Sequence, residues 1–145
     1  MNAQTSAAST LGEAIIEHMA EAVIYANREG TIERWNAAAV QMFDFSAAEA
    51  IGQRMDLMIP EHLRVAHWRG FDAAMNSGAL RLNGRATLTR GLHKSGRKLY
   101  IEMSFALVRD AAGALVGSVA VARDVTERVE REKAARAPSS AGGSS

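Results

Sequence analysis

The chain has 145 residues, of which 48% are hydrophobic and 23% charged, a composition typical of a folded globular domain. Its formal net charge of +1 argues against a nucleic-acid partner, and its lack of cysteine excludes disulfides, thiolate metal sites and cysteine-based photochemistry. No apolar run approaches the roughly 20 residues that cross a bilayer. We therefore expect one cytoplasmic domain with no membrane partner.

The N-terminal part is expected to form a leader and a short helix. Residues 1–9 are small and polar without periodicity, which indicates a disordered leader. Thr10 begins the pattern T-L-G-E, a capping box in which the Thr10 hydroxyl and the Glu13 carboxylate satisfy free N–H groups at a helix start. The apolar stripe of this helix, expected over 10–20, consists of Leu11, Ile15 and Met19.

The next segment has the pattern of a β-hairpin followed by two short helices. The apolar run A-V-I-Y-A-N ends at N-R-E-G and precedes the alternating T-I-E-R-W, which predicts a hairpin over 22–35. Asn36 is a good N-cap for the helix that comes next. A second capping box, S-A-A-E from Ser46 to Glu49, starts another helix that stops at Gly52.

A longer helix is predicted over 60–77, between a proline at its first position and a glycine after its last apolar residue. Its apolar face repeats every four residues, at Leu63, His67, Phe71 and Met75. This spacing directs the imidazole of His67 toward the interior, where a hydrogen-bond partner or a ligand should satisfy it.

The C-terminal part has the pattern of three strands and a polar helix. The strands are predicted over 84–93, 97–109 and 114–123. The second alternates strictly, and the third is apolar throughout, which indicates a central position covered on both faces. Asp124 begins a third capping box, D-V-T-E, and the polar helix expected over 124–137 needs a partner to be stable. Residues 138–145 are rich in Ser and Gly and are expected to form a flexible tail.

Several motifs are similar to those of one known family. They are A-E-A-V-I-Y-A-N-R-E-G-T-I-E-R-W-N, F-D-F-S-A-A-E-A-I-G-Q, H-K-S-G-R and V-A-R-D-V-T-E-R. Together with the order of elements, they resemble a PAS domain over residues 10–130. The resemblance implies an α+β fold, with a five-stranded antiparallel sheet and short helices that cover one face and enclose a ligand-sized cavity. The sensor domain is then expected over 10–123, with flanking helices on both sides.

The segment M-I-P-E-H-L-R-V-A-H is similar to haem-binding PAS domains of the FixL and Dos type, which carry the pattern M/L-x-P-x-x-x-R-x-x-H. The last His of that pattern is the proximal ligand of haem b, and His67 falls on it. The resemblance thus implies His67 as the ligand of haem iron, with Met103 or a water in the sixth position. The cofactor-binding residues that it implies are Leu63, His67, Phe71, Arg85, Thr87, Ile101, Met103, Phe105 and Val119.

The chain departs from this group at the distal side. Thr87 takes the place of the arginine that hydrogen-bonds dioxygen in those sensors, and Arg85 lies two residues away on the same expected strand face. We therefore do not expect this site to stabilise dioxygen, and the signals expected in its place are carbon monoxide, nitric oxide or redox state. Arg64, the arginine of the motif, is expected to be solvated or to pair with a haem propionate. Trp68, which follows the motif, is expected to face a partner or solvent.

We therefore expect a signal-sensing homodimer that binds haem b and a small-molecule or gas ligand. Its C-terminal helix would pass the signal to an output kinase, cyclase or regulator domain. One alternative is a haem-free PAS domain whose cavity is filled by side chains and which acts as a dimerisation or interaction adaptor. Another is a PAS domain that binds FAD without a covalent bond. We expect no catalysis, because the sequence has neither the glycine-rich nucleotide motifs nor a Ser/His/Asp constellation on plausible elements.

Overall fold

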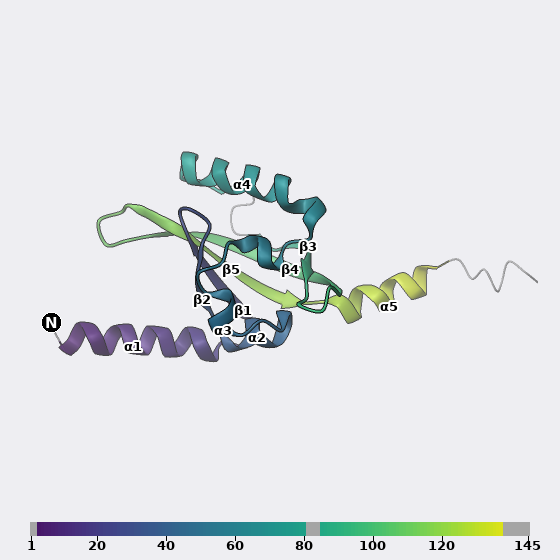
Figure 1. Cartoon of the computed structure of the whole chain (residues 1–145), viewed down its shortest axis with the longest axis horizontal. Helices are drawn as coiled ribbons and strands as arrows, with labels where there is room; N and C mark the ends of the chain where they lie inside the picture. Colours follow the sequence, from purple (N-terminus) through teal and green to yellow (C-terminus); the bar gives the residue numbers. More distant parts are fainter. Residues whose placement is uncertain (1–2, 81–84, 138–145) are drawn as a thin grey trace, which may run out of the picture.

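The computed structural model describes residues 3–80 and 85–137. Its elements are α1 (Ala3–His18), β1 (Ala22–Asn27), β2 (Ile32–Trp35), α2 (Ala37–Phe43), α3 (Ala47–Ala50), the 3-10 helices η1 (Met55–Met58) and η2 (Glu61–Leu63), α4 (Arg64–Ser77), β3 (Thr87–Leu92), β4 (Lys98–Arg109), β5 (Leu115–Asp124) and α5 (Thr126–Arg136). Figure 1 shows α1 and α5 extending from opposite ends of the molecule, with α4 along one side of the sheet. Among the described helices, none has the length and apolar character needed to cross a bilayer.

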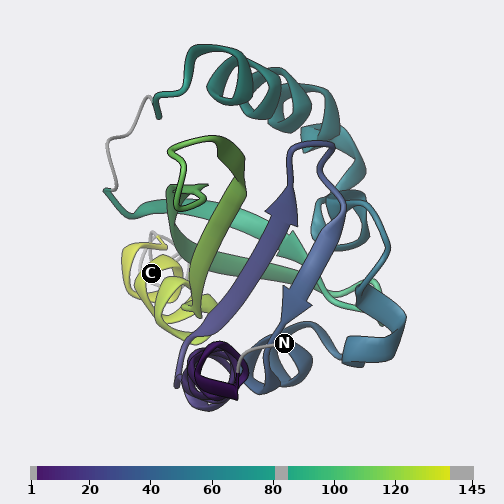
Figure 2. The same cartoon turned by 90° about the vertical axis from the view of Figure 1, so that its left-hand side faces the viewer.

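The five strands form one antiparallel sheet in the order β2-β1-β5-β4-β3. This architecture confirms the α+β fold that the motifs implied. Strand β5 is third in the order, which confirms the central position expected from its apolar character. Figure 2 shows the sheet in the middle of the molecule, with α1, α4 and α5 around it.

The core lies on one face of the sheet, beneath the helices between β2 and β3. Its largest fully buried hydrophobic side chains are Phe43, Ile24, Ile32, Leu99 and Ile101. Four methionines, each at most 7% exposed, belong to the same cluster: Met55, Met58, Met75 and Met103. Because methionine is flexible and fills irregular spaces, a core of this kind can change its packing more readily than one made of branched side chains.

Asn36 joins the end of α1, the start of β1 and the start of α2. Its Oδ1 atom accepts hydrogen bonds from the backbone N–H groups of Val23 (2.9 Å) and Ala39 (3.1 Å). Its Nδ2 atom donates to the carbonyl oxygens of Ile16 (2.8 Å) and Glu21 (3.0 Å). The bond from Ala39 confirms the predicted N-cap of α2. The predicted capping box of Ser46 is also present.

Two predicted starts differ from the structure at the ends of the domain. Helix α1 begins at Ala3, so most of the expected leader is helical and Thr10 lies inside a helix. The alanines of this segment favour a helix without a capping signal. At the other end, the Asp124 carboxylate accepts a hydrogen bond from the Thr126 N–H (2.9 Å), and α5 has no side-chain cap bond from its N-cap residue, Val125. The tail expected over 138–145 lies outside the described residues.

Candidate functional site

Helix α4, which carries His67, is attached to the preceding turns at its N-terminal end. Arg64 donates from Nε to the carbonyl oxygen of Ile59 (3.0 Å) and from Nη2 to that of Asp56 (3.2 Å). The first bond gives the Ile59 carbonyl, just past η1, a partner, and the second is shared with the Ile59 N–H, which also donates to the Asp56 carbonyl (3.1 Å). The expectation of a solvated Arg64 is therefore wrong. Gly78 ends α4 with φ +71°, as its role as a helix stop requires.

His67 is partly buried among aromatic rings of its own helix. Its ring stacks on Phe71, with centroids 6.2 Å apart, and meets the Trp68 indole edge-on at 4.8 Å. Its Nδ1 atom is buried and has no hydrogen-bond partner among the described residues. Burial lowers the pKa of His67, and the nearby Asp56 carboxylate offsets this only in part. The imidazole is therefore neutral at pH 7.

A neutral imidazole with a buried nitrogen that has no partner among the described residues can bind a metal ion. Buried polar atoms nearly always have a partner in folded proteins, so this exception requires an explanation. Neutral histidine is the common nitrogen ligand of haem. Within the described part of the chain, no group of three or more His, Cys, Asp or Glu side chains could hold a metal ion. A metal ion bound to His67 would therefore need its other ligands from a cofactor, such as the nitrogen atoms of a porphyrin.

Most of the predicted cofactor residues lie together in the fold. Phe71, Ile101 and Met103 are buried in the core cluster, and Leu63 and Phe105 pack against it. Thr87 is the direct neighbour of Met103 across the β3–β4 pair, and the two share a sheet face. The candidate site therefore brings Phe71 of α4 into one core cluster with Ile101 and Met103 of β4, with Thr87 of β3 beside Met103.

Two predicted residues do not belong to this site. Val119 is paired with Tyr25 and Ala106, whereas its neighbour Ala120 is buried in the core. Because side chains alternate along a strand, Val119 faces away from the core, and its assignment as a cofactor residue is wrong. Strand β3 begins at Thr87, so Arg85 precedes the strand, and it is exposed. The strand face that Arg85 and Thr87 were expected to share therefore does not exist.

The sequence reasoning missed the role of Trp68, which was expected to point toward a partner or solvent. The indole is partly buried and donates from Nε1 to Oδ1 of Asp56 (2.6 Å). The Arg54 guanidinium lies 4.1 Å from its ring centroid. The helical pattern gave no sign of these contacts. The one signal in the sequence was that tryptophan usually buries most of its large surface.

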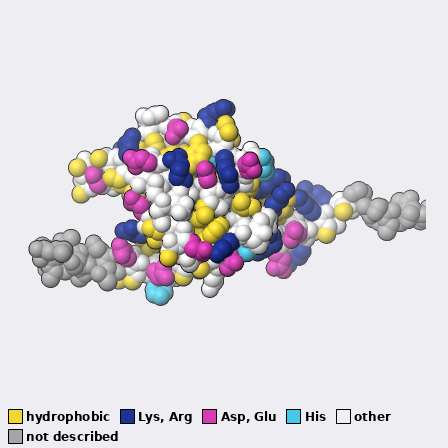
Figure 3. Space-filling view, viewed as in Figure 1, with side chains coloured by type: hydrophobic (Ala, Val, Ile, Leu, Met, Phe, Trp, Pro, Cys, Tyr) yellow, Lys and Arg dark blue, Asp and Glu magenta, His cyan; other side chains and the backbone are white. Residues whose placement is uncertain are grey.

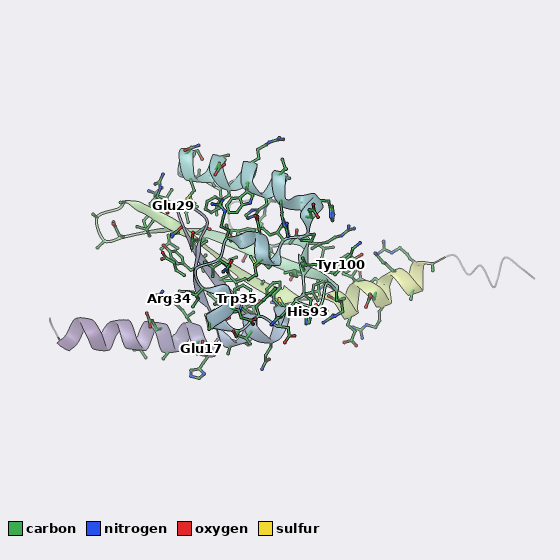
Figure 4. The ribbon with its side chains drawn as sticks, viewed as in Figure 1. Glu17, Glu29, Arg34, Trp35, His93 and Tyr100 are labelled. Carbon is green, nitrogen blue, oxygen red and sulfur yellow. The ribbon has the colours of Figure 1, made fainter. Side chains whose placement is uncertain are left out.

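The outer face of β4 holds the first turns of α5. The N–H of Tyr100 donates to Thr126 Oγ1 (2.9 Å), and the N–H of Val125 donates to the carbonyl oxygen of Tyr100 (2.9 Å). The Lys133 ammonium donates to the Tyr100 phenol oxygen and lowers its pKa. Figure 4 labels Tyr100 where β4 meets α5, and Figure 3 shows Lys and Arg side chains gathered in the same region. These bonds connect β4 directly to the start of α5.

Comparison with known families decides the identity of the fold. The family model described as the PAS fold matches residues 16–130. The chain belongs to the PAS fold family. A curated relative of this PAS domain is the oxygen sensor protein DosP of Escherichia coli (strain K12), 27% identical over 123 residues. The match covers 85% of this chain but 15% of DosP, so the domain spans a small part of that relative.

Solved structures support the same fold. A PAS domain from Colwellia psychrerythraea has a TM-score of 0.71 at 19% identity and covers 83% of this chain and 98% of its own. An RNA-binding light-oxygen-voltage receptor has a TM-score of 0.68 at 23% identity, over 88% of this chain and 36% of the receptor. A PAS domain from a two-component sensor histidine kinase has a TM-score of 0.65 at 18% identity, over 83% of this chain and 98% of its own. At these identities the neighbours establish the PAS fold alone.

Proposed function

We propose that this PAS domain is a sensor that binds haem b through His67 and responds to a diatomic gas or to redox state. The observation that carries the proposal is the buried Nδ1 atom of a neutral His67, which has no hydrogen-bond partner among the described residues. The match to DosP, whose name describes an oxygen sensor, supports a gas-sensing role. Bound haem would supply an iron atom that takes up a gas ligand or changes its oxidation state.

The chain's own residues provide an adaptable apolar environment for such a group. Phe71, Met75 and Met103 belong to the packed core, so a planar cofactor beside His67 requires some of these side chains to move. Methionines do this at low cost because their side chains are unbranched. Thr87 and Met103 are neighbours on the inner face, and neither carries a cationic donor for bound dioxygen. We therefore favour carbon monoxide, nitric oxide or redox state over dioxygen as the signal.

Output would pass through α5 to an attached or separate partner such as a kinase, cyclase or regulator domain. Strand β4 carries Ile101 and Met103 on its buried face, and its Tyr100 bonds to the start of α5. In this proposal one strand therefore connects the cofactor to the helix. A displacement of the inner side chains moves the backbone of the same strand and hence the first turn of α5. In this proposal the domain acts in the cytoplasm and has no catalytic activity of its own.

Absorbance spectroscopy of the purified protein, supplied with haemin, tests the cofactor. A Soret band is expected for the wild type and should be lost in His67→Ala. His62→Ala is the matched control, because His62 lies in the same segment but is exposed and should leave the band unchanged. Absence of the band in the wild type, or its persistence in His67→Ala, would contradict the proposal. A flavin spectrum would indicate FAD, and no chromophore at all would indicate the haem-free adaptor.

A homodimer formed through α1 is the second part of the proposal. Leu11 and Ile15 on α1 are 63% and 56% exposed, and Met19, just past the end of the helix, is 37% exposed. The three recur every four residues and form an exposed apolar stripe. Burying such a stripe against a second copy removes it from water. Sedimentation analysis should show a dimer that Ile15→Glu dissociates and that Glu17→Lys, on the other side of the helix, leaves intact. A wild-type monomer would refute this part alone.

A further inference from the structure

Trp68 is attached to the body of the domain at three points. Its indole Nε1 donates to the Asp56 carboxylate of η1 (2.6 Å), and the Arg54 guanidinium stacks 4.1 Å from its centroid. Its six-membered ring also contacts the backbone of Gly30 in the β1–β2 turn: a Cβ atom at Gly30 would lie 2.3 Å from both Cη2 and Cζ3. Gly30 is therefore the residue that leaves room for the indole.

The same indole contacts the two other aromatic residues of α4. It meets His67 edge-on at 4.8 Å and Phe71 edge-on at 5.4 Å. Edge-to-face contacts of this kind are directional, so they favour a particular ring orientation as well as burial. The buried Nδ1 atom of His67 makes no hydrogen bond to a described residue that could fix the plane of the imidazole. Its orientation thus depends on packing against Trp68 and Phe71.

We infer that Trp68 is the positioning residue of His67. By attaching α4 to η1 and to the β1–β2 turn, it sets the rotation of the helix about its axis, and by its edge contact it sets the plane of the imidazole. The inference rests on the proposed function, because the position of the His67 ring matters most if that ring is a ligand. Groups that orient a metal-binding histidine usually do so by a hydrogen bond. Here the edge contact of the Trp68 indole orients the His67 ring instead.

A residue that served only to stabilise the fold would act differently. Trp35 provides the comparison, since it is also buried and donates from its indole Nε1, to the carbonyl oxygen of Phe45 (2.9 Å). Its ring contact is with Phe43, outside α4. Trp68→Phe and Trp35→Phe each remove one indole hydrogen bond while keeping an aromatic ring. Both variants should lose stability, but only Trp68→Phe should disturb His67.

Haem titration of the two variants gives the first measurement. We expect Trp68→Phe to weaken haem binding about 10- to 100-fold, the range seen when groups that orient a metal ligand are changed. Trp35→Phe should bind haem as the wild type does. Equal dissociation constants for wild type and Trp68→Phe, or equal weakening in both variants, would overturn the inference. If Trp68→Phe does not fold, Asp56→Ala takes its place, because it removes the acceptor and keeps the indole.

Nuclear magnetic resonance of the haem-free protein gives the second measurement and separates the two hypotheses. Nuclear Overhauser contacts between the rings of His67 and Phe71 should be present in wild type and Trp35→Phe and lost in Trp68→Phe. Their persistence in Trp68→Phe overturns the positioning role whether or not haem binds. A wild type that takes up no haem refutes the proposed function, and the positioning role is then decided by these contacts alone.

Discussion

Asn36→Ala removes a side chain that is only 2% exposed and makes hydrogen bonds to four backbone groups. Two of the bonds, from Val23 and Ala39, are buried, so their N–H groups lose their partner without access to water. At about 1 kcal/mol for each hydrogen bond, the loss comes to about 4 kcal/mol. Because domains of this size are stable by about 5–15 kcal/mol, the variant should be close to unfolding.

Asn36→Asp makes a sharper version of the same test. The new carboxyl keeps the accepted bonds but turns its second oxygen toward the carbonyl oxygens of Ile16 and Glu21. Only its protonated form can donate to one of them, and burial also disfavours the charge, so the folded state raises the pKa of this carboxyl above its usual value. The protonated carboxyl therefore stabilises the folded variant fully at a pH below the pKa that this group has in the unfolded chain. The stabilisation is lost as the pH rises through the higher pKa that the group has in the folded state.

Urea unfolding followed by circular dichroism measures both effects, at neutral pH and in mild acid. Asn76→Asp is the control, because Asn76 is exposed on α4. Its replacement should not make the free energy of unfolding larger in acid relative to the wild type. A loss below about 1 kcal/mol in Asn36→Ala would show that Asn36 does not join the three elements as described. Equal destabilisation of Asn36→Asp at the two pH values would refute the reasoning on its donor bonds.

Two further predictions concern the tyrosines and two glycines. Burial raises the pKa of Tyr25, and the hydrogen bond from Lys133 lowers that of Tyr100, so ultraviolet titration should show two separate steps. Lys133→Ala should move only the lower step, upward; one shared step in the wild type would contradict this. Gly91→Ala should destabilise by about 1–3 kcal/mol, since the new Cβ would lie 2.2 Å from a buried isoleucine Cδ1. Gly70→Ala, with nothing within 4 Å, should instead stabilise by about 0.5–1 kcal/mol, and thermal unfolding that gave both the same sign would reject the argument.

The sequence predicted best the features that depend on neighbouring residues. The N-cap of Asn36 and the capping box of Ser46 are present because each is formed within one turn of helix. The alternation of β4 predicted the inner position of Ile101 and Met103 because one face of that strand is much more apolar than the other. The start of α1 was wrong because an alanine-rich segment can be helical without any boundary signal.

Features that depend on residues far apart in the chain could not be predicted from the hydrophobic pattern. Strand β5 is apolar on both faces, so its sequence lacks the alternation of apolar and polar residues that would indicate which way Val119 points. The position of Trp68 depends on Asp56 in η1 and on the absence of a side chain at Gly30, which no spacing within α4 reveals. That His67 Nδ1 has no hydrogen-bond partner within residues 3–80 and 85–137 is likewise visible only when the packing around the ring is known.

The attachment of α5 to Tyr100 has a consequence for engineered fusions. Because the first turn is fixed to β4 through Val125 and Thr126, the sheet sets the angular phase of the whole helix. Each residue inserted into a continuous helix turns the downstream segment by about 100° and advances it by about 1.5 Å. An effector joined to α5 through a helical spacer should therefore respond periodically to spacer length, with similar output restored after about seven residues.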